Sequence, residues 1–268
     1  MSRGRLVQLA LVGAAAGLFS GLFGVGGGVV IVPLLILWLA FDERTATGTS
    51  LLAIGIIAAA AVIAHGLAYG NVHVGDGLLV GIPAVGGVLA GTWLQHHIPG
   101  YVVRLLFAVL MVGTAVLIVA NVGLSAGGGS GPGYYAAAVA IGACAGVLSG
   151  LLGVGGGALF VPALVLVLGL DQVDAEATSL LAIVPVSVVG AWRQKGYGNL
   201  EPKAGLVIGV TAVPFAVAGV VAVNAAPAKV VEVGFALLLL WVAWQMARDA
   251  LVDLRVARNP AGGPPGPA

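Results

Sequence analysis

The chain has 268 residues, of which 60% are hydrophobic and only 8% are charged, and its formal net charge is +1. A soluble globular protein carries about a quarter charged residues to hydrate its surface, so this composition excludes a soluble globule. The small net charge provides no basic surface for nucleic acid, and the single cysteine, Cys144, excludes an intramolecular disulfide. Several apolar stretches approach about 20 residues, the length that crosses a bilayer as a helix, and they predict an all-α polytopic membrane protein.

Ten apolar runs are expected to form helices, five on each side of a Gly/Ser-rich segment. The two runs that begin at residues 28 and 157 would give about 20 Å of helix, short of a hydrocarbon core of about 30 Å. We therefore predict eight to ten membrane helices. The first run resembles a secretory signal peptide, but it recurs far from any cleavage position and is interpreted as a retained helix. The runs are 6–23, 28–40, 47–65, 77–94, 101–120, 134–152, 157–170, 177–192, 204–223 and 228–247.

The two sets of five runs match in order and in sequence. Residues 17–35 read GLFSGLFGVGGGVVIVPLL, and residues 146–164 read GVLSGLLGVGGGALFVPAL, 129 positions later (146 − 17 = 129). The stretch Thr49-Ser50-Leu51-Leu52 likewise returns as Thr178-Ser179-Leu180-Leu181. This self-similarity predicts two homologous transmembrane repeats. We assign them to residues 1–123 and 134–254, with a Gly/Ser linker at 124–133 and a disordered Pro/Gly tail at 255–268.

The lysines and arginines predict how the repeats are oriented, since these residues favour the cytoplasmic side. If each repeat crosses the membrane an odd number of times and the N-terminus is cytoplasmic, every basic residue except Lys229 falls inside. An even number of crossings would move Arg44 and Arg104 outside. We therefore expect inverted repeats in a multi-pass protein of the cell (inner) membrane, with both termini in the cytoplasm.

The glycines fall into two groups. Glycines four residues apart line one helix face with hydrogen atoms and allow another helix to approach closely, so we assign them to packing. The four glycines in each copy of GVGGG are different, because each would destabilise a continuous helix by about 1 kcal/mol. We expect them to break the helix inside the membrane. The packing glycines are Gly13, Gly17 and Gly21, Gly142, Gly146 and Gly150, Gly87 and Gly91, and Gly205 and Gly209.

A helix that restarts after such a break presents free N–H groups and the positive end of its dipole, which together can bind an anion. A tight turn without a ligand is the alternative. Hydroxyls at the starts of two apolar runs could add donors, although Ser and Thr there are also ordinary N-caps. Ser20 and Ser149, one turn before the breaks, are weaker candidates. The predicted substrate-binding residues are Gly24, Gly26, Gly27, Gly28, Thr49, Ser50, Gly153, Gly155, Gly156, Gly157, Thr178 and Ser179.

Ionisable residues add little to the predicted site. No Lys-Ser/Thr follows the glycines, so they do not form a P-loop. No carboxylate is placed at mid-membrane, and His65 is interpreted as an interfacial residue. Glu232 and Arg104 occupy equivalent positions in the two repeats and could form an ion pair. Glu176 stands where the first repeat has Thr47, so the two half-sites need not be equivalent. We predict no catalytic residue, metal or cofactor, and no enzyme activity.

The doubled LxSGLxGVGGGxxxVP motif, the Thr-Ser-Leu-Leu repeat and the Tyr-Gly-Asn turns resemble the TauE/SafE family of sulfite exporters and related anion permeases. The resemblance covers about residues 6–250. It implies a prokaryotic-type inner-membrane transporter without ATPase machinery, whose relatives export sulfite, sulfoacetate and other small sulfur or organic anions.

From this resemblance we expect a secondary transporter that exports sulfite, a sulfonate or a related sulfur or organic anion. Its expected partners are this small anion and the lipid bilayer, with no nucleic acid, and homo-oligomerisation is left open. An uncoupled anion channel and a non-transporting membrane assembly partner are the alternatives.

Overall fold

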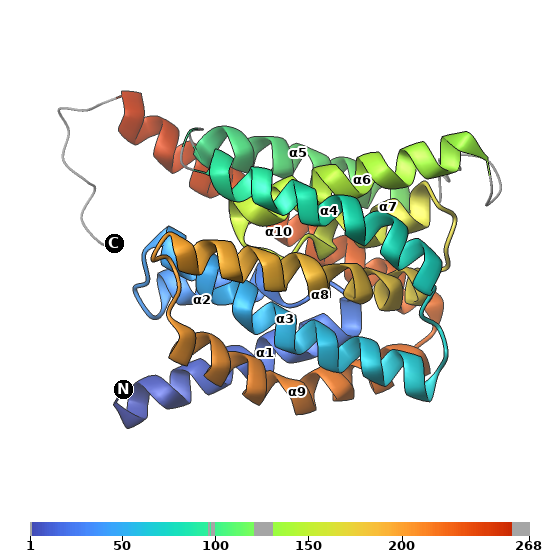
Figure 1. Cartoon of the computed structure of the whole chain (residues 1–268), viewed down its shortest axis with the longest axis horizontal. Coiled ribbons are helices and arrows are strands. Elements are labelled where there is room, and N and C mark those ends of the chain that lie inside the picture. The colour runs from blue at the N-terminus through green and yellow to red at the C-terminus, as the bar shows by residue number, and fades with distance from the viewer. Residues whose placement is uncertain (1, 96, 98–99, 121–130, 259–268) are drawn as a thin grey trace.

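The structure is a computed structural model, and it describes residues 2–95, 97, 100–120 and 131–258. Within these ranges the chain is all-helical, as the sequence predicts (Figure 1). The helices are α1 (Arg3–Phe23), α2 (Gly28–Leu37), α3 (Glu43–Ala68), α4 (Val74–Leu94), α5 (Gly100–Val119), α6 (Pro132–Leu152), α7 (Gly157–Leu166), α8 (Gln172–Gly196), α9 (Pro202–Ala225) and α10 (Ala228–Arg258).

In the described part of the chain, seven helices are long and apolar enough to cross a membrane: α1, α3, α4, α6, α8, α9 and residues 229–252 of α10. Helices α2 and α7 have ten residues each and are too short to do so. A total of eight to ten membrane helices stays a prediction. Helix α10 reaches Arg258, inside the predicted tail at 255–268, and the rest of that tail lies outside the described residues. Of the predicted linker, residues 124–130 also lie outside them.

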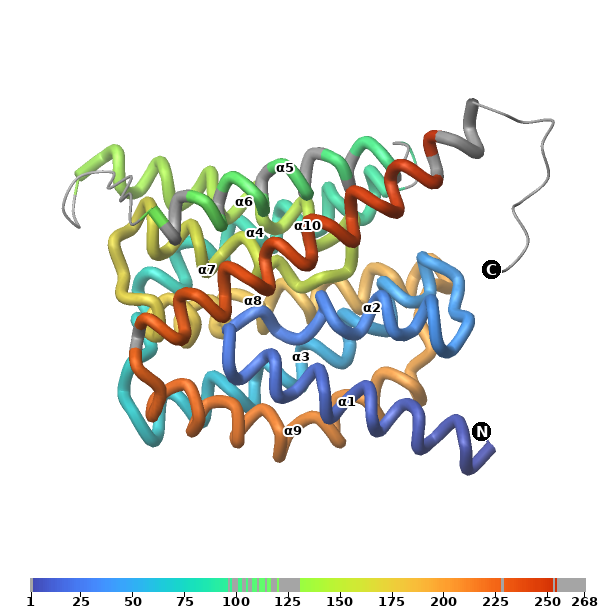
Figure 2. The backbone as a smooth tube through the Cα atoms, turned by 180° about the vertical axis from the view of Figure 1, so that it is seen from behind, coloured from blue at the N-terminus to red at the C-terminus, as the bar shows by residue number. Residues whose placement is uncertain are grey.

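Both predicted helix breaks are present. Helix α1 ends at Phe23 with Gly24 as its C-cap, and Gly24, Gly26 and Gly27 have φ angles of 63°, 75° and 77° in the left-handed region. The residues between α6 and α7 repeat this conformation, with φ angles of 69°, 80° and 80° at the equivalent glycines. Glycine adopts these angles without the steric cost that a side chain would add. After each break the chain turns back, so that α2 returns toward the end of the molecule where α1 begins, and α7 toward the end where α6 begins (Figure 2).

Two helix pairs pack closely through the glycines spaced four residues apart. A Cβ atom added to Gly17 would overlap the carbonyl of Ala212, so α1 lies directly on α9. A Cβ atom on Gly146 would overlap the carbonyl of Ala84, so α6 lies on α4 in the same way. The packing role predicted for these glycines is therefore confirmed. Helices α3 and α8 pack against each other between these two pairs, and α5 packs against α10.

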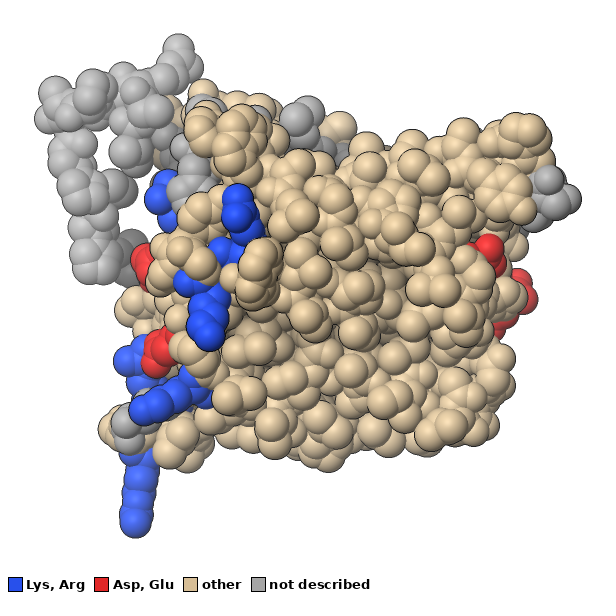
Figure 3. All heavy atoms as spheres, in the orientation of Figure 1, with Lys and Arg blue, Asp and Glu red and all other residues tan. Residues whose placement is uncertain are grey.

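Charged side chains lie at the two ends of the helices. Lys and Arg gather at the end that holds the N-terminus, whereas Asp and Glu occur at both ends (Figure 3). At the N-terminal end, Arg5 lies 3.6 Å from the Glu201 carboxylate and 5.1 Å from the centre of the Phe41 ring. Glu232 is bonded to Lys229 at 3.1 Å, and the side chain of Arg104, its predicted partner, lies outside the described residues.

Candidate functional site

The two helix breaks meet in the interior of the protein. A Cβ atom added to Gly28 would lie 2.7 Å from Cα of Val154, and one added to Gly157 would lie 2.5 Å from Cα of Val25. The start of each short helix therefore rests on the backbone of the other repeat's break. Gly26 and Gly155 both face the side chains of Ile54 and Ile183, which are equivalent residues at the middle of α3 and α8. The fold thus brings the two glycine clusters to one place, shared by both repeats.

The short helices begin with free backbone donors. Helices α2 and α7 have glycine at the N-cap, so no side chain caps either start. In the described residues, the amides of Gly28 and Val29, and of Gly157 and Ala158, have no hydrogen-bond acceptor. Unpaired N–H groups and the dipole give the start of a helix a partial positive charge. Two such starts, buried and in contact, form a region able to attract negative charge without a charged side chain.

Ser50 and Ser179 connect the repeats in a crossed arrangement. Ser50 Oγ donates to the carbonyl oxygen of Gly153 at 2.6 Å, and Ser179 Oγ donates to that of Gly24 at 2.7 Å. Each hydroxyl is also within 2.8 Å of a carbonyl of its own helix. Each serine therefore satisfies a backbone carbonyl that the other repeat's break leaves unpaired, and its hydroxyl hydrogen is used within the protein.

Thr49 and Thr178 make a second set of contacts between the repeats. Thr49 Oγ1 accepts the amide hydrogen of Glu201 at 3.0 Å, immediately before α9, and Thr178 Oγ1 accepts that of His73 at 3.0 Å, immediately before α4. In this structure both hydroxyls thus lie at the starts of other helices. Direct binding of substrate by these residues stays a prediction.

Ser20 and Ser149 carry hydroxyl groups that are left unpaired beside the breaks. Both are fully buried, at 0% exposure, and neither hydroxyl has a hydrogen-bond partner among the described residues. Their backbone carbonyls accept the amides of Gly24 and Gly153 at 2.9 and 2.8 Å, which places them one turn before each break. A buried hydroxyl without a partner is unfavourable, so these two groups are available to a ligand.

The same faces of α1 and α6 touch the breaks. One turn before Ser20, the carbonyl oxygen of Ala16 would lie 2.7 Å from a Cβ atom on Gly27. One turn before Ser149, the carbonyl oxygen of Ala145 would lie 3.3 Å from a Cβ atom on Gly156. Residues four apart share one helix face. The serines that the sequence ranked as weaker candidates are therefore placed next to the predicted glycine sites.

Glu176 is a buried carboxylate that the sequence analysis did not place in the membrane interior. Its exposure is 0%, and its backbone packs on the first break, where a Cβ atom on Gly24 would lie 2.5 Å from Cα of Glu176. Gln172 Nε2 donates to its Oε1 at 2.8 Å, and its Oε2 has no partner in the described chain. The sequence analysis did not foresee this burial, which arises because α8 begins at Gln172 and places Glu176 one turn inside the helix. The absence of a carboxylate at mid-membrane stays a prediction. The one sequence feature that set Glu176 apart was its alignment with Thr47 of the first repeat.

Two equivalent polar clusters lie near the ends of α3 and α8. His65 is fully buried, with Nδ1 3.1 Å from Asn71 Oδ1, and Asn71 Nδ2 donates to Asn224 Oδ1 at 3.2 Å. His65 thus lies inside the protein near the end of α3, and its location at the membrane interface stays a prediction. Its equivalent in the second repeat, Gln194, is also fully buried and donates to Gln95 Oε1 at 2.8 Å. These clusters hold the connections between α3 and α4 and between α8 and α9.

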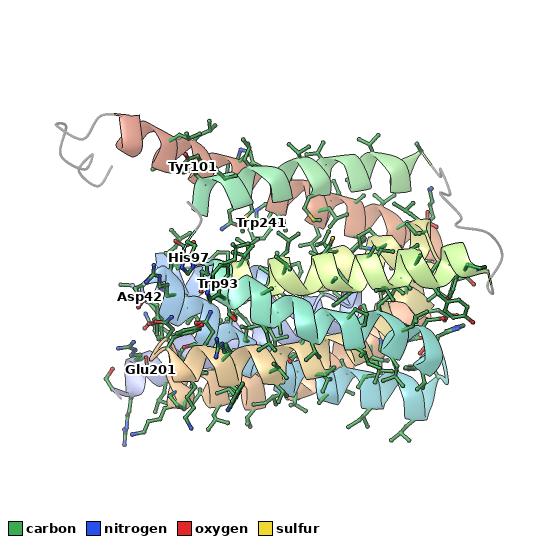
Figure 4. The ribbon with its side chains drawn as sticks, turned by 45° about the horizontal axis from the view of Figure 1, so that its top comes forward. Asp42, Trp93, His97, Tyr101, Glu201 and Trp241 are labelled. Carbon is green, nitrogen blue, oxygen red and sulfur yellow. The ribbon has the colours of Figure 1, made fainter. Side chains whose placement is uncertain are left out.

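A pocket of about 400 Å³ leads from the N-terminal end of the molecule toward the second break. The buried side chains of Val32, Leu152 and Gln245 line its inner part, and the exposed Glu43 and Arg248 line its outer part. Leu152 immediately precedes the first glycine of the second break, so the pocket approaches the site from this end. Figure 4 shows Asp42 and Glu201, at the starts of α3 and α9, at the same end.

Comparison with known proteins identifies the chain. It is 30% identical over 178 residues to the probable membrane transporter protein YdhB of Bacillus subtilis, an alignment that covers 65% of this chain and 72% of that protein. A family model described as sulfite exporter TauE/SafE matches residues 137–267. The chain belongs to the TauE/SafE family. The resemblance seen in the doubled glycine motif is therefore confirmed.

Other relatives of this TauE/SafE protein extend the similarity along the chain. A probable membrane transporter protein of Haemophilus influenzae is 28% identical over 255 residues, covering 88% of this chain and 96% of the relative. YunE of Bacillus subtilis, also a probable membrane transporter protein, is 29% identical over 209 residues, covering 69% of this chain and 76% of the relative. No solved structure matches the chain. The protein is thus a multi-pass membrane transporter of the TauE/SafE family.

Proposed function

We propose that this protein is a secondary transporter that exports a small anion, namely sulfite, a sulfonate or a related sulfur or organic anion. The observation that carries the proposal is the meeting of two buried helix starts next to two buried, unpaired hydroxyls, Ser20 and Ser149. All of these groups can donate hydrogen bonds, and oxyanions present several acceptor oxygens. The family description, sulfite exporter, favours a sulfur oxyanion among the anions that fit.

In this proposal the predicted glycines form the anion site and the serines divide into two roles. The breaks at Gly24–Gly28 and Gly153–Gly157 supply backbone N–H groups, and Ser20 and Ser149 add hydroxyl donors. Ser50 and Ser179 hold the breaks in position through the carbonyl oxygens of the opposite repeat. Because the described residues place no fixed cation at the site, it attracts an anion by dipoles and can release it again.

We further propose that the repeats are inverted and that both termini are cytoplasmic. Helices α1 and α6 begin at opposite ends of the molecule (Figure 2), which supports inversion. The N-terminal end holds most of the basic side chains (Figure 3), which supports a cytoplasmic location. The pocket that contains Glu43 then opens to the cytoplasm.

Equivalent residues at the two ends of the molecule differ in exposure, and this asymmetry supports a transporter over a channel. Glu43 is exposed in the pocket, whereas Gln172, at the equivalent position of α8, is only 6% exposed. In alternating access, movement of the two repeats opens the site to one side of the membrane at a time. An uncoupled channel would require a path open at both ends.

The proposal can be tested with purified protein in liposomes of confirmed insertion. We expect saturable flux of at least one anion from a panel of sulfite, thiosulfate, sulfoacetate and organic acids. The double variant Ser20→Ala/Ser149→Ala should raise the KM about 10-fold or more, because a hydrogen bond to a charged group contributes about 1.5–3 kcal/mol. Its thermal stability should not fall, because the lost hydroxyls have no partner in the described protein.

Ser187→Ala is the matched control, since Ser187 is a buried serine whose hydroxyl donates within its own helix, to Val184 O at 2.9 Å. An unchanged KM in the double variant would contradict the proposed site. Wild-type flux that never saturates and shows no counter-transport would favour the channel. No flux of any anion in the panel would contradict anion transport itself.

A further inference from the structure

The anion site leaves the carboxyl group of Glu176 without a role. Among the described residues, Glu176 is the only acidic side chain that is buried, and it is completely enclosed. One carboxyl oxygen, Oε1, accepts a hydrogen bond from Gln172 Nε2 at 2.8 Å. The other oxygen, Oε2, has no partner in the described structure, and neither has Oε1 of Gln172. The protein therefore encloses a titratable carboxyl group and leaves one of its two oxygens without a hydrogen bond in the described structure.

The charges around this end of α8 do not compensate Glu176. His73 Nε2 lies 3.0 Å from Asp174 Oδ2, and Lys229 Nζ lies 3.1 Å from Glu232 Oε2, so both basic side chains are paired with other carboxylates. No ion pair found in the described part of the chain includes Glu176. The titratable groups on the elements at this end are His65 of α3, His73 and Asp76 of α4, Tyr134 of α6, Asp171 and Asp174 at the start of α8, and Lys229 and Glu232 of α10.

A buried carboxyl group in these surroundings is a proton carrier. An ionised carboxylate without a cation is strongly disfavoured in an apolar interior, whereas the neutral acid needs only hydrogen bonds. Glu176 therefore suits this enclosed state in its protonated form, and it can lose the proton when a conformational change brings it to water. Building on the proposed transport function, we propose that Glu176 binds a proton and carries it through the membrane together with the substrate anion.

The position of Glu176 beside the first break determines the direction of this coupling. Its backbone packs against Gly24, so Glu176 lies beside the break at which the anion is proposed to bind. Two negative charges repel each other in a poorly solvated site, so the anion binds when Glu176 is neutral. Proton and anion therefore bind together and move in the same direction. In the proposed export, the outward gradient of the anion drives both of them out of the cell, and in liposomes the same coupling can be measured in the inward direction. The equivalent residue in the first repeat, Thr47, cannot titrate, so one proton accompanies each transport cycle.

The experiment uses proteoliposomes with a pH-sensitive dye trapped inside and thiosulfate or methanesulfonate outside, since both remain ionised at neutral pH. For wild-type protein we expect anion entry to bring in about one proton per anion, and an acidic exterior to raise the initial anion influx several-fold. Glu176→Gln keeps the size and polarity of the side chain but cannot bind the proton. This variant should show no anion-dependent proton entry and no response of anion influx to the pH gradient.

Glu232→Gln is the matched control, because it removes a carboxylate at the same end of the molecule that is already paired with Lys229, and it should behave as wild type. Glu176→Thr, which copies the first repeat, is a second variant should Glu176→Gln fail to fold, with folding judged by gel filtration and thermal unfolding. Anion-coupled proton entry that persists in either folded variant overturns the proposal. Wild-type anion flux that carries no protons, or that requires sodium, also overturns the proposal. In that case the proposed transport function still stands. Absence of all anion flux in the wild type contradicts the transport function instead.

Discussion

Replacing Ser179 with alanine should destabilise the protein, because the hydroxyl is the donor that satisfies a buried carbonyl of the first break. Ser179 Oγ lies 2.7 Å from Gly24 O and 2.8 Å from Glu176 O. The carbonyl of Glu176 lies within α8, where the helix supplies a donor, but Gly24 O has no other donor in the described chain. Leaving one buried acceptor unpaired costs about 1–3 kcal/mol. For a protein of this size that corresponds to a fall in Tm of about 2–10 °C.

The assay is thermal unfolding in detergent, followed by the fluorescence of the five tryptophans. Ser187→Ala is again the control, because Ser187 is buried in the same helix and its hydroxyl donates within that helix, to the carbonyl of Val184. We expect Ser187→Ala to change the Tm by no more than about 1 °C, in line with an effect below about 0.5 kcal/mol. If Ser179→Ala and Ser187→Ala have the same Tm, the connection between the repeats does not stabilise the fold as described.

Two further predictions concern the packing of helices and the pH dependence of stability. Gly17→Ala should lower the Tm strongly, because the added Cβ atom would overlap a backbone carbonyl of α9, whereas Gly86→Ala adds an atom with nothing within 4 Å and should be neutral or stabilising by up to about 1 kcal/mol. Equal Tm values for the two variants would contradict the close packing of α1 on α9. Asp42 caps α3 by accepting the amide of Thr45 at 3.0 Å. Hydrogen bonding from the Thr45 side chain, together with bonds from backbone amides, lowers the pKa of the Asp42 carboxyl below its ordinary value. The cap therefore stabilises the fold above about pH 4 and its contribution is lost as the pH falls through the lowered pKa. Asp42→Ala should cost about 1 kcal/mol at neutral pH, and a Tm difference from wild type that does not shrink in acid would refute this.

The sequence predicted the apolar middle of each helix better than its ends. The apolar run 47–65 lies within α3, which begins earlier at Glu43 because Asp42 caps it. The run 228–247 lies within α10, which continues to Arg258. Hydropathy marks where a helix lies in an apolar environment, and a helix continues into water wherever caps and propensity allow. The short helices after the glycines were predicted because glycine clusters interrupt both copies of one apolar segment.

The candidate site was predicted in its backbone and only in part in its side chains. The glycines could be found because four of them within five residues disfavour a continuous helix, and because the cluster occurs twice. The different roles of Thr49 and Ser50 could not be predicted from the sequence. Adjacent helix residues point in different directions, and only the packed structure shows which one meets the opposite break. Glu176 was missed for a related reason: its burial depends on where α8 begins, which the apolar run starting at residue 177 does not reveal.

The crossed serine contacts have a consequence for the origin of this protein. The break in each half is completed by a hydroxyl from the other half, so neither half contains all the groups that its own backbone requires. Two separately produced halves would each expose an unpaired carbonyl in the bilayer until they met. An ancestral chain with a single copy could satisfy this requirement by pairing with an oppositely inserted copy of itself. Joining two such copies in one chain would make that pairing permanent and would allow the copies to differ, as Glu176 and Thr47 do in this sequence.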